Sequence, residues 1–140
     1  MGRIGYVAAT DRVRPREAVD LAKLAEAAGF DGTLVSDLFQ PWLPSLGQAP
    51  NVWATLGALA EHVSGDFGAG MAVPGERMHP ASLAQASATL AALNPGRHWL
   101  SVSAGEALSE HVTGGYWPEA PERINRLFEA IELMKRLFAA

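Results

Sequence analysis

The sequence predicts an α/β fold built from four consecutive strand–helix units. Apolar segments begin near residues 4, 33, 67 and 98, and each is followed by a segment with helical periodicity. The interval of about 30 residues is the length of a βαβ unit, and such units in series form a parallel sheet covered by helices. With 140 residues, 49% of them apolar, the chain is expected to be a single domain, residues 1–140.

The first unit begins with the short apolar run Ile4–Ala9, which is typical of a strand buried on both faces. Pro15 is expected to open the first helix, because a first helical residue needs no N–H, and Gly29 is expected to end it. Thr33–Ser36 is the second strand. The loop that follows contains three prolines, so we expect it to be ordered by its own contacts.

The later units repeat this pattern. Asn51 is expected to cap the second helix. Phe67–Val73 is the third strand, and Pro80 opens the helix after it. Trp99–Ser103 is the fourth strand, and a short helix is expected over Glu106–His111. A long helix follows, opened by Pro121, and its apolar residues are expected to line one face. These residues are Ile124, Leu127, Phe128, Ile131 and Phe138.

Two architectures fit four such units. One is a small, open, doubly wound sheet, and the other is the first half of an eight-stranded barrel. A half barrel leaves two sheet edges and an inner face uncovered, so it needs its other half or a second copy. The strand order separates them, because 1-2-3-4 is typical of a barrel and 2-1-3-4 of an open sheet.

The composition excludes several classes of protein. The net charge is −4 and there is no Lys/Arg run, so no nucleic-acid partner is expected. Cysteine is absent, which excludes disulfides, and the four histidines share no metal-ligand spacing, so no metal site is predicted. No apolar run approaches the roughly 18 residues of a membrane helix, and the N-terminus lacks a signal-peptide core. We therefore expect a cytoplasmic protein without membrane contacts.

Two acidic residues, Asp37 and Glu106, each follow an apolar strand. Loops at the carboxyl ends of parallel strands line the ligand crevice, so the two side chains are candidates for one pocket. Paired carboxyl groups raise each other's pKa, which would let one of them act as an acid near neutral pH. The alternative is that Asp37 caps its own loop and that Glu106 occupies the first turn of a short helix.

Three further features are candidates for ligand contacts. Trp42 would form the wall of a pocket for a flat ring or a sugar, or would pack against its own loop. Gly68 and Gly70 lie in one strand, where they indicate a bulge for a flat cofactor or a tight helix–strand contact. Ser103-Ala104-Gly105 precedes a helix N-terminus, whose N–H groups suit a phosphate or a carboxylate.

Several motifs occur in the order found in one enzyme family. They are Val35-Ser36-Asp37, Phe39-Gln40-Pro41-Trp42, Gln48-Ala49-Pro50, Gly68–Pro74, Pro80–Gln85, Asn94-Pro95-Gly96-Arg97 and Gly105-Glu106-Ala107-Leu108. The ordered set resembles the N-terminal half of a luciferase-like oxidoreductase, in the glucose-6-phosphate dehydrogenase branch that uses the deazaflavin coenzyme F420. The resemblance implies four β–α units of a TIM (β/α)8 barrel, a half barrel with parallel strands in the order 1-2-3-4.

The resemblance also implies roles for individual residues. The cofactor-binding residues that it implies are Asp37, Gly70, Met71, Ala104, Gly105 and Ser109. Gly70-Met71 would be a bulge behind the ring, often a cis peptide in this family. Trp42 and Glu106 would face a small-molecule substrate, with Glu106 as proton donor or acceptor during hydride transfer. The implied partner is a second copy, in a homodimer, or a C-terminal half barrel.

One position departs from the family. Leu38 stands where the catalytic histidine is expected, and leucine can neither accept nor release a proton. Sugar-phosphate oxidation by the usual route is therefore in question, and FMN is an alternative cofactor. A second alternative is a half barrel without turnover that closes by self-association.

Overall fold

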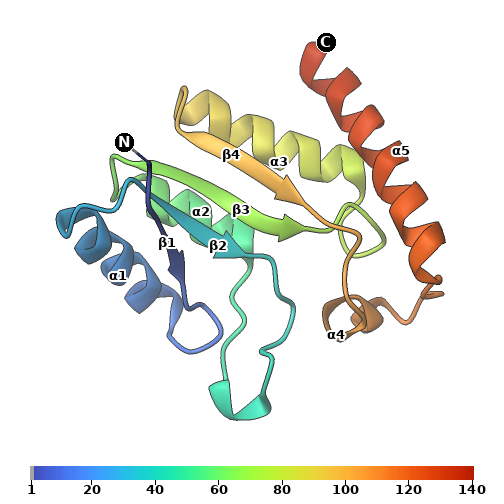
Figure 1. Cartoon of the computed structure of the whole chain (residues 1–140), viewed down its shortest axis with the longest axis horizontal. Coiled ribbons are helices and arrows are strands. Elements are labelled where there is room, and N and C mark those ends of the chain that lie inside the picture. The colour runs from blue at the N-terminus through green and yellow to red at the C-terminus, as the bar shows by residue number, and fades with distance from the viewer. Residues whose placement is uncertain (1) are drawn as a thin grey trace.

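The computed structural model describes residues 2–140 and has a parallel α/β architecture (Figure 1). The strands are β1 (Gly5–Ala8), β2 (Gly32–Ser36), β3 (Asp66–Ala72) and β4 (His98–Val102). The helices are α1 (Pro15–Ala27), α2 (Val52–Ala60), α3 (Pro80–Leu93), α4 (Ala107–Glu110) and α5 (Ala120–Ala139), with 3-10 turns η1 (Pro44–Leu46) and η2 (His111–Thr113). The strands are all parallel, in the order β1-β2-β3-β4, so the barrel order is confirmed and the switched order of an open sheet is wrong.

Helices α1, α2 and α3 begin at the residues that the sequence predicted. Pro15 and Pro80 are the first residues of α1 and α3, where a missing N–H breaks no helical bond. The Asn51 side chain accepts a hydrogen bond from the Ala54 N–H at 3.0 Å, which caps α2. Gly29, with φ of 96°, follows α1 in the left-handed region that glycine tolerates.

One face of the sheet carries the hydrophobic core. Val35 and Phe67 point from β2 and β3 toward the helices and are fully buried, as are Leu56 and Leu59 of α2 and Leu83 of α3. In Figure 1, α2 and α3 lie behind the sheet, α1 lies at the left and packs against β1 and α2, and α5 lies beside α3. Among residues 2–140 no helix is long and apolar enough to cross a bilayer.

The opposite face of the sheet is uncovered. Val7, Leu34, Gly68 and Trp99 are in register across the four strands on this face. Val7 is 59% exposed, so the prediction that the first strand is buried on both faces is wrong. The reason is that the helices cover only one side of the sheet, and β1 lies at its edge. We call this surface the inner face.

The packing of α5 also differs from the prediction. Its buried residues are Ala130 and Met134, which lie in the contact with α3. Ile124, Phe128 and Phe138, expected on a packed face, are exposed. Ala130 and Met134, rather than the larger apolar residues of α5, therefore form its buried side.

Candidate active site

The two acidic stretches lie together at the carboxyl-terminal rim of the sheet. The Phe39 N–H donates to Ser109 Oγ at 3.3 Å, and Gln40 Nε2 donates to the Leu108 carbonyl at 2.8 Å. These bonds join the loop after β2 to α4, across about 70 residues of sequence. Asp37 and Glu106 therefore belong to one rim, as the parallel topology requires.

A buried ion cluster joins this rim to the loop between β3 and α3. Arg77 in that loop donates to both carboxylate oxygens of Asp37, at 2.9 and 2.7 Å, and its Nε donates to Glu110 Oε1 at 3.0 Å. The Asp37 and Glu110 side chains are only 5% and 6% exposed, so this cluster is shielded from water. Two-point contact of this kind is the strongest ion-pair geometry that arginine offers.

The cluster shifts the pKa of two of its members. Burial lowers the pKa of Arg77, but hydrogen bonds and charges from Asp37 and Glu110 outweigh burial, so its pKa is raised and the guanidinium stays charged. Burial raises the pKa of Glu110; Arg77 lowers it, and the charges of Asp37 and Glu106 raise it further. The net shift of the Glu110 pKa is upward, because burial outweighs the contact with Arg77.

Arg77 and Glu110 were not among the predicted site residues. Glu110 follows Glu106 by one helical turn, and Arg77 is the only Lys or Arg in the loop 73–79. A pair of acids four residues apart, with one cation in a neighbouring rim loop, is the signal that would have indicated them.

Glu106 lies immediately before α4, with no hydrogen bond from its side chain. Its Oε1 atom is buried and unpartnered, which is unusual because buried polar atoms nearly always have a partner. Ala104 and Gly105 before it are half-buried, and Gly105 has φ of 79°. The rim therefore presents small residues next to a carboxyl group whose hydrogen-bonding capacity is partly unused.

The end of β3 carries a bulge. The pairing with β4 shifts between Ala69 and Ala72, and Met71 has φ of 56°, in the left-handed region that few non-glycine residues adopt. Met71 is 52% exposed, whereas Gly70 is buried under Leu34. All peptide bonds of residues 2–140 are trans, so the cis peptide that the resemblance implied at Gly70-Met71 is wrong. The chain bends here through φ of Met71 instead.

The other predicted site residues differ in how far their side chains are exposed to solvent. Ser109 is fully buried, and its hydroxyl accepts the Phe39 N–H. Both oxygens of Asp37 are engaged by Arg77. The cofactor contacts expected of these two residues stay predictions. Trp42 is 56% exposed on the loop after β2, and Leu38 is half-buried in the same loop.

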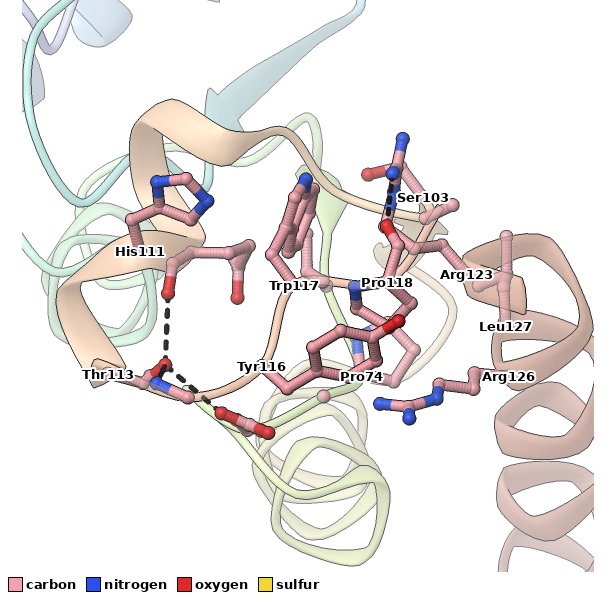
Figure 2. Close-up of a pocket in the computed structure, with 16 residues that line it drawn as sticks. Pro74, Ser103, His111, Thr113, Tyr116, Trp117, Pro118, Arg123, Arg126 and Leu127 are labelled. Atoms are coloured by element: carbon pink, nitrogen blue, oxygen red, sulfur yellow. Dashed lines mark hydrogen bonds between the residues drawn. The ribbon is translucent and has the colours of Figure 1, made fainter. Parts of the chain in front are cut away.

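A small pocket adjoins the cluster, between α4, the segment 113–118 and the start of α5 (Figure 2). Trp117 lies at its centre, with Arg123 stacked at 4.5 Å from the ring and His111 edge-on at 5.8 Å. Arg123 also donates to the Pro118 carbonyl at 2.7 Å. The volume is about 60 Å³, well below the roughly 300–1,000 Å³ of a typical ligand site. Trp117 therefore packs its own loop, and this pocket alone does not hold a ring cofactor.

Within residues 2–140, no three His, Asp or Glu side chains are grouped so that they could hold a metal ion. The carboxyl groups of Asp37 and Glu110 are directed to Arg77 instead.

Comparisons with known proteins agree with this geometry. The family model described as luciferase-like monooxygenase matches residues 3–140. The F420-dependent glucose-6-phosphate dehydrogenase of Mycolicibacterium fortuitum is 46% identical over 139 residues, and that of Microbacterium testaceum (strain StLB037) is 44% identical over 138. An F420-dependent secondary alcohol dehydrogenase, solved with an F420-acetone adduct, superposes with a TM-score of 0.95 at 36% identity.

The matches cover unequal shares of the proteins compared. They include 97% and 98% of this chain but 41% of each dehydrogenase. For the secondary alcohol dehydrogenase they include 99% of this chain and 42% of that chain. The chain thus spans about two fifths of the length of the relatives it matches.

Proposed function

Because the chain belongs to the luciferase-like monooxygenase family, we propose that it forms the N-terminal half of a barrel oxidoreductase that uses coenzyme F420. The observation that carries the proposal is Glu106, which has a buried, unpartnered oxygen and directly follows the small residues Ala104 and Gly105 on the rim. Support comes from relatives whose names specify F420-dependent dehydrogenases. We place the protein in the cytoplasm, where a redox coenzyme pool is available.

The rim fits a flat ring. Met71, Ala104 and Gly105 are at least partly exposed and offer two small residues and one flexible, polarisable side chain. Any side chain at position 105 would come within 3.1 Å of Glu110 Cγ and Val73 Cγ1, in addition to the strain of φ at 79°. Glycine at 105 is therefore required by its own turn and by close packing against Glu110 and Val73, and this fixes the backbone of the rim at this point. Gly70, Asp37 and Ser109 would support these contacts from behind.

A bound deazaflavin supplies the carbon that accepts or donates a hydride. In the proposal, Glu106 gives or takes the accompanying proton, since its unpartnered oxygen is free to bond a ligand atom. The exposed Trp42 forms one wall for the substrate. The Arg77 cluster keeps water away from the other side of the rim, because its members are largely buried and hydrogen-bonded to one another.

The substrate class follows from the relatives and from Leu38. A small hydroxylated compound is the expected substrate, since both kinds of relative are named for oxidation of alcohols or sugars. Leu38 cannot remove the hydroxyl proton. We therefore expect a different proton acceptor, and Glu106 is the candidate in this chain because its carboxyl group has an unpartnered oxygen.

The inner face indicates a covering partner. Val7, Ile4 and Trp99 expose apolar surface there, and a shallow hollow of about 290 Å³ lies over β1 and β2. Both β1 and β4 have an unpaired edge. A C-terminal half barrel would cover this surface and complete the site, and a homodimer is the second arrangement that would do so.

The test is a titration with F420 and with FMN, followed by cofactor fluorescence. It is performed on this chain alone, on the chain with a C-terminal half from the dehydrogenase of Mycolicibacterium fortuitum, and on that intact dehydrogenase as a positive control. Saturable binding of F420 but not FMN by the completed barrel supports the proposal. If only FMN binds, the cofactor in the proposal becomes FMN, and the assignment of the fold is unchanged. A compact dimer of this chain that binds neither would favour a self-associated half barrel without turnover.

A further inference from the structure

We propose that Arg77 is the positioning residue of this rim, which holds α4 so that Glu106 is presented to the cofactor. The role rests on the proposed function, because it concerns the residue that would handle the proton. Neither the sequence motifs nor the names of the relatives assign a role to Arg77.

Arg77 joins three separate segments. Its guanidinium contacts Asp37 after β2 and Glu110 at the end of α4, while its own backbone belongs to the loop between β3 and α3. The Asp37 N–H also donates to the Gly70 carbonyl at 3.0 Å, next to the bulge. One side chain therefore connects the loops that follow β2, β3 and β4.

The position of Glu106 depends on this connection. α4 has only four residues, and a single turn is not stable by itself in water. The Glu110 N–H donates to the Glu106 carbonyl at 3.2 Å, so the two residues are the ends of the same turn. Since the Glu106 side chain has no hydrogen bond of its own, its direction is set by where this turn is docked.

The other contacts of α4 are weaker. Ser109 and Leu108 are held by one neutral hydrogen bond each, from Phe39 and Gln40. The contact of Glu110 with Arg77 is charge-assisted and buried. Lysine cannot replace Arg77, because an ammonium group does not provide the fork that contacts two carboxyl groups at once.

The experiment compares Arg77→Lys with Arg3→Gln in the completed barrel, which is this chain together with the C-terminal half described above. Arg3 also pairs with an aspartate, Asp66, at 2.7 Å, but on the exposed surface at the opposite end of the strands. Amide hydrogen exchange is measured first, because it does not depend on the cofactor. We expect exchange in residues 106–113 to become at least tenfold faster in Arg77→Lys, with the core strands unchanged, and no change in Arg3→Gln.

Turnover is then measured in a double-mutant cycle with Glu106→Gln. A displacement of about 1 Å at a reacting group costs on the order of 100-fold, so Arg77→Lys is expected to lower kcat by that factor with cofactor affinity nearly unchanged. In the Glu106→Gln background the same substitution is expected to have almost no effect on kcat, because Arg77 acts through Glu106.

Two outcomes would overturn the inference. One is unchanged exchange in residues 106–113, and the other is an equal fractional loss of kcat with and without the Glu106 carboxylate. If the wild-type protein binds no F420 and no FMN, the proposed function fails. The exchange measurement then still decides whether Arg77 holds α4.

Discussion

Asp37 and Arg77 face each other with both pairs of polar atoms in contact, Nη1 to Oδ1 at 2.9 Å and Nη2 to Oδ2 at 2.7 Å. The pair joins the end of β2 to the loop after β3. Both side chains are largely removed from water, and Arg77 is the partner of both Asp37 oxygens. Loss of Asp37 leaves the Arg77 guanidinium paired with Glu110 alone and two of its N–H groups without that partner, and the first prediction follows from this.

Asp37→Ala is expected to lower the free energy of unfolding by about 1.5–3 kcal/mol, the range for losing hydrogen bonds to a charged group, because Glu110 still pairs with Arg77. Urea denaturation gives the value. The control is Glu122→Ala, which breaks the exposed pair between Glu122 and Arg126 and is expected to cost less than about 1 kcal/mol. Equal effects of the two substitutions would mean that the rim pair contributes no more than a surface contact.

Gly68→Ala and Gly57→Ala are expected to change stability in opposite directions. A Cβ atom on Gly68 would lie 2.4 Å from the Trp99 ring and carbonyl, so we expect a loss of about 1–3 kcal/mol. A Cβ atom on Gly57, inside α2, meets nothing within 4 Å, and alanine there is expected to stabilise by about 0.5–1 kcal/mol. Thermal denaturation of both variants tests this. A gain from Gly68→Ala would show that Trp99 can move away from β3.

The elements of this fold were predictable because their signals are local. Pro15 and Pro80 start helices through their own backbone geometry, and apolar runs form strands through their own periodicity. The strand order was predictable only through the resemblance, since periodicity alone left an open sheet as an alternative. Burial was predicted less well. Whether Val7 is covered depends on what lies over the inner face, and nothing in residues near Val7 encodes that.

The site was predictable in part for the same reason. Asp37 and Glu106 were identifiable because each directly follows a strand, and parallel topology brings strand ends to one rim. Arg77 was not, because its contacts lie 40 and 33 residues away in sequence and depend on the conformation of its loop. The bulge at Met71 was indicated by the neighbouring glycines, but its trans peptide was not.

Stability is expected to respond to pH with opposite signs through two groups, the half-buried His98 and the buried Glu110. Burial lowers the pKa of His98, although a hydrogen bond with the Phe67 backbone raises it somewhat, and its ring pairs with Ser87 Oγ at 2.9 Å. Below the ordinary value of 6.5 the unfolded chain therefore takes up a proton that the folded chain does not, and stability falls. The pKa of Glu110 is raised, so the folded chain is protonated first as pH falls toward 4.5, and stability rises.

Two substitutions separate these contributions. His98→Gln is expected to remove the loss of stability below pH 6.5, and Glu110→Gln is expected to remove the gain toward pH 4.5. Urea midpoints measured from pH 4.5 to 8 give both slopes. A wild-type slope that neither substitution changes would assign the pH dependence to other groups.

Glu106→Gln is expected to suppress turnover and leave folding almost unchanged. Because Oε1 of Glu106 has no partner, replacing the carboxyl group by an amide breaks no hydrogen bond of the folded chain. We therefore expect the free energy of unfolding to change by no more than about 0.5 kcal/mol. Loss of a proton-transferring carboxyl group typically lowers the rate by about 10²–10⁴. Steady-state kinetics of the completed barrel, with a denaturation curve for the same sample, tests both parts. Retained activity would remove Glu106 from the proposed chemistry.

Leu38→His is expected to increase oxidation of a hydroxylated substrate in the completed barrel. Leu38 is half-buried on the rim loop that begins at Asp37, and a neutral imidazole there could accept the hydroxyl proton. The increase should therefore develop as pH rises through about 6.5, the ordinary pKa of histidine. Leu38→Asn is the control, since asparagine is polar but cannot serve as a base in this pH range.

Glucose 6-phosphate and a secondary alcohol are compared as substrates, with absorbance of the cofactor as the readout. An equal response to histidine and asparagine would show that polarity at position 38, rather than proton transfer, limits turnover. No response to either would mean that the proton leaves by another group, and Glu106 in this chain would then be tested for that step.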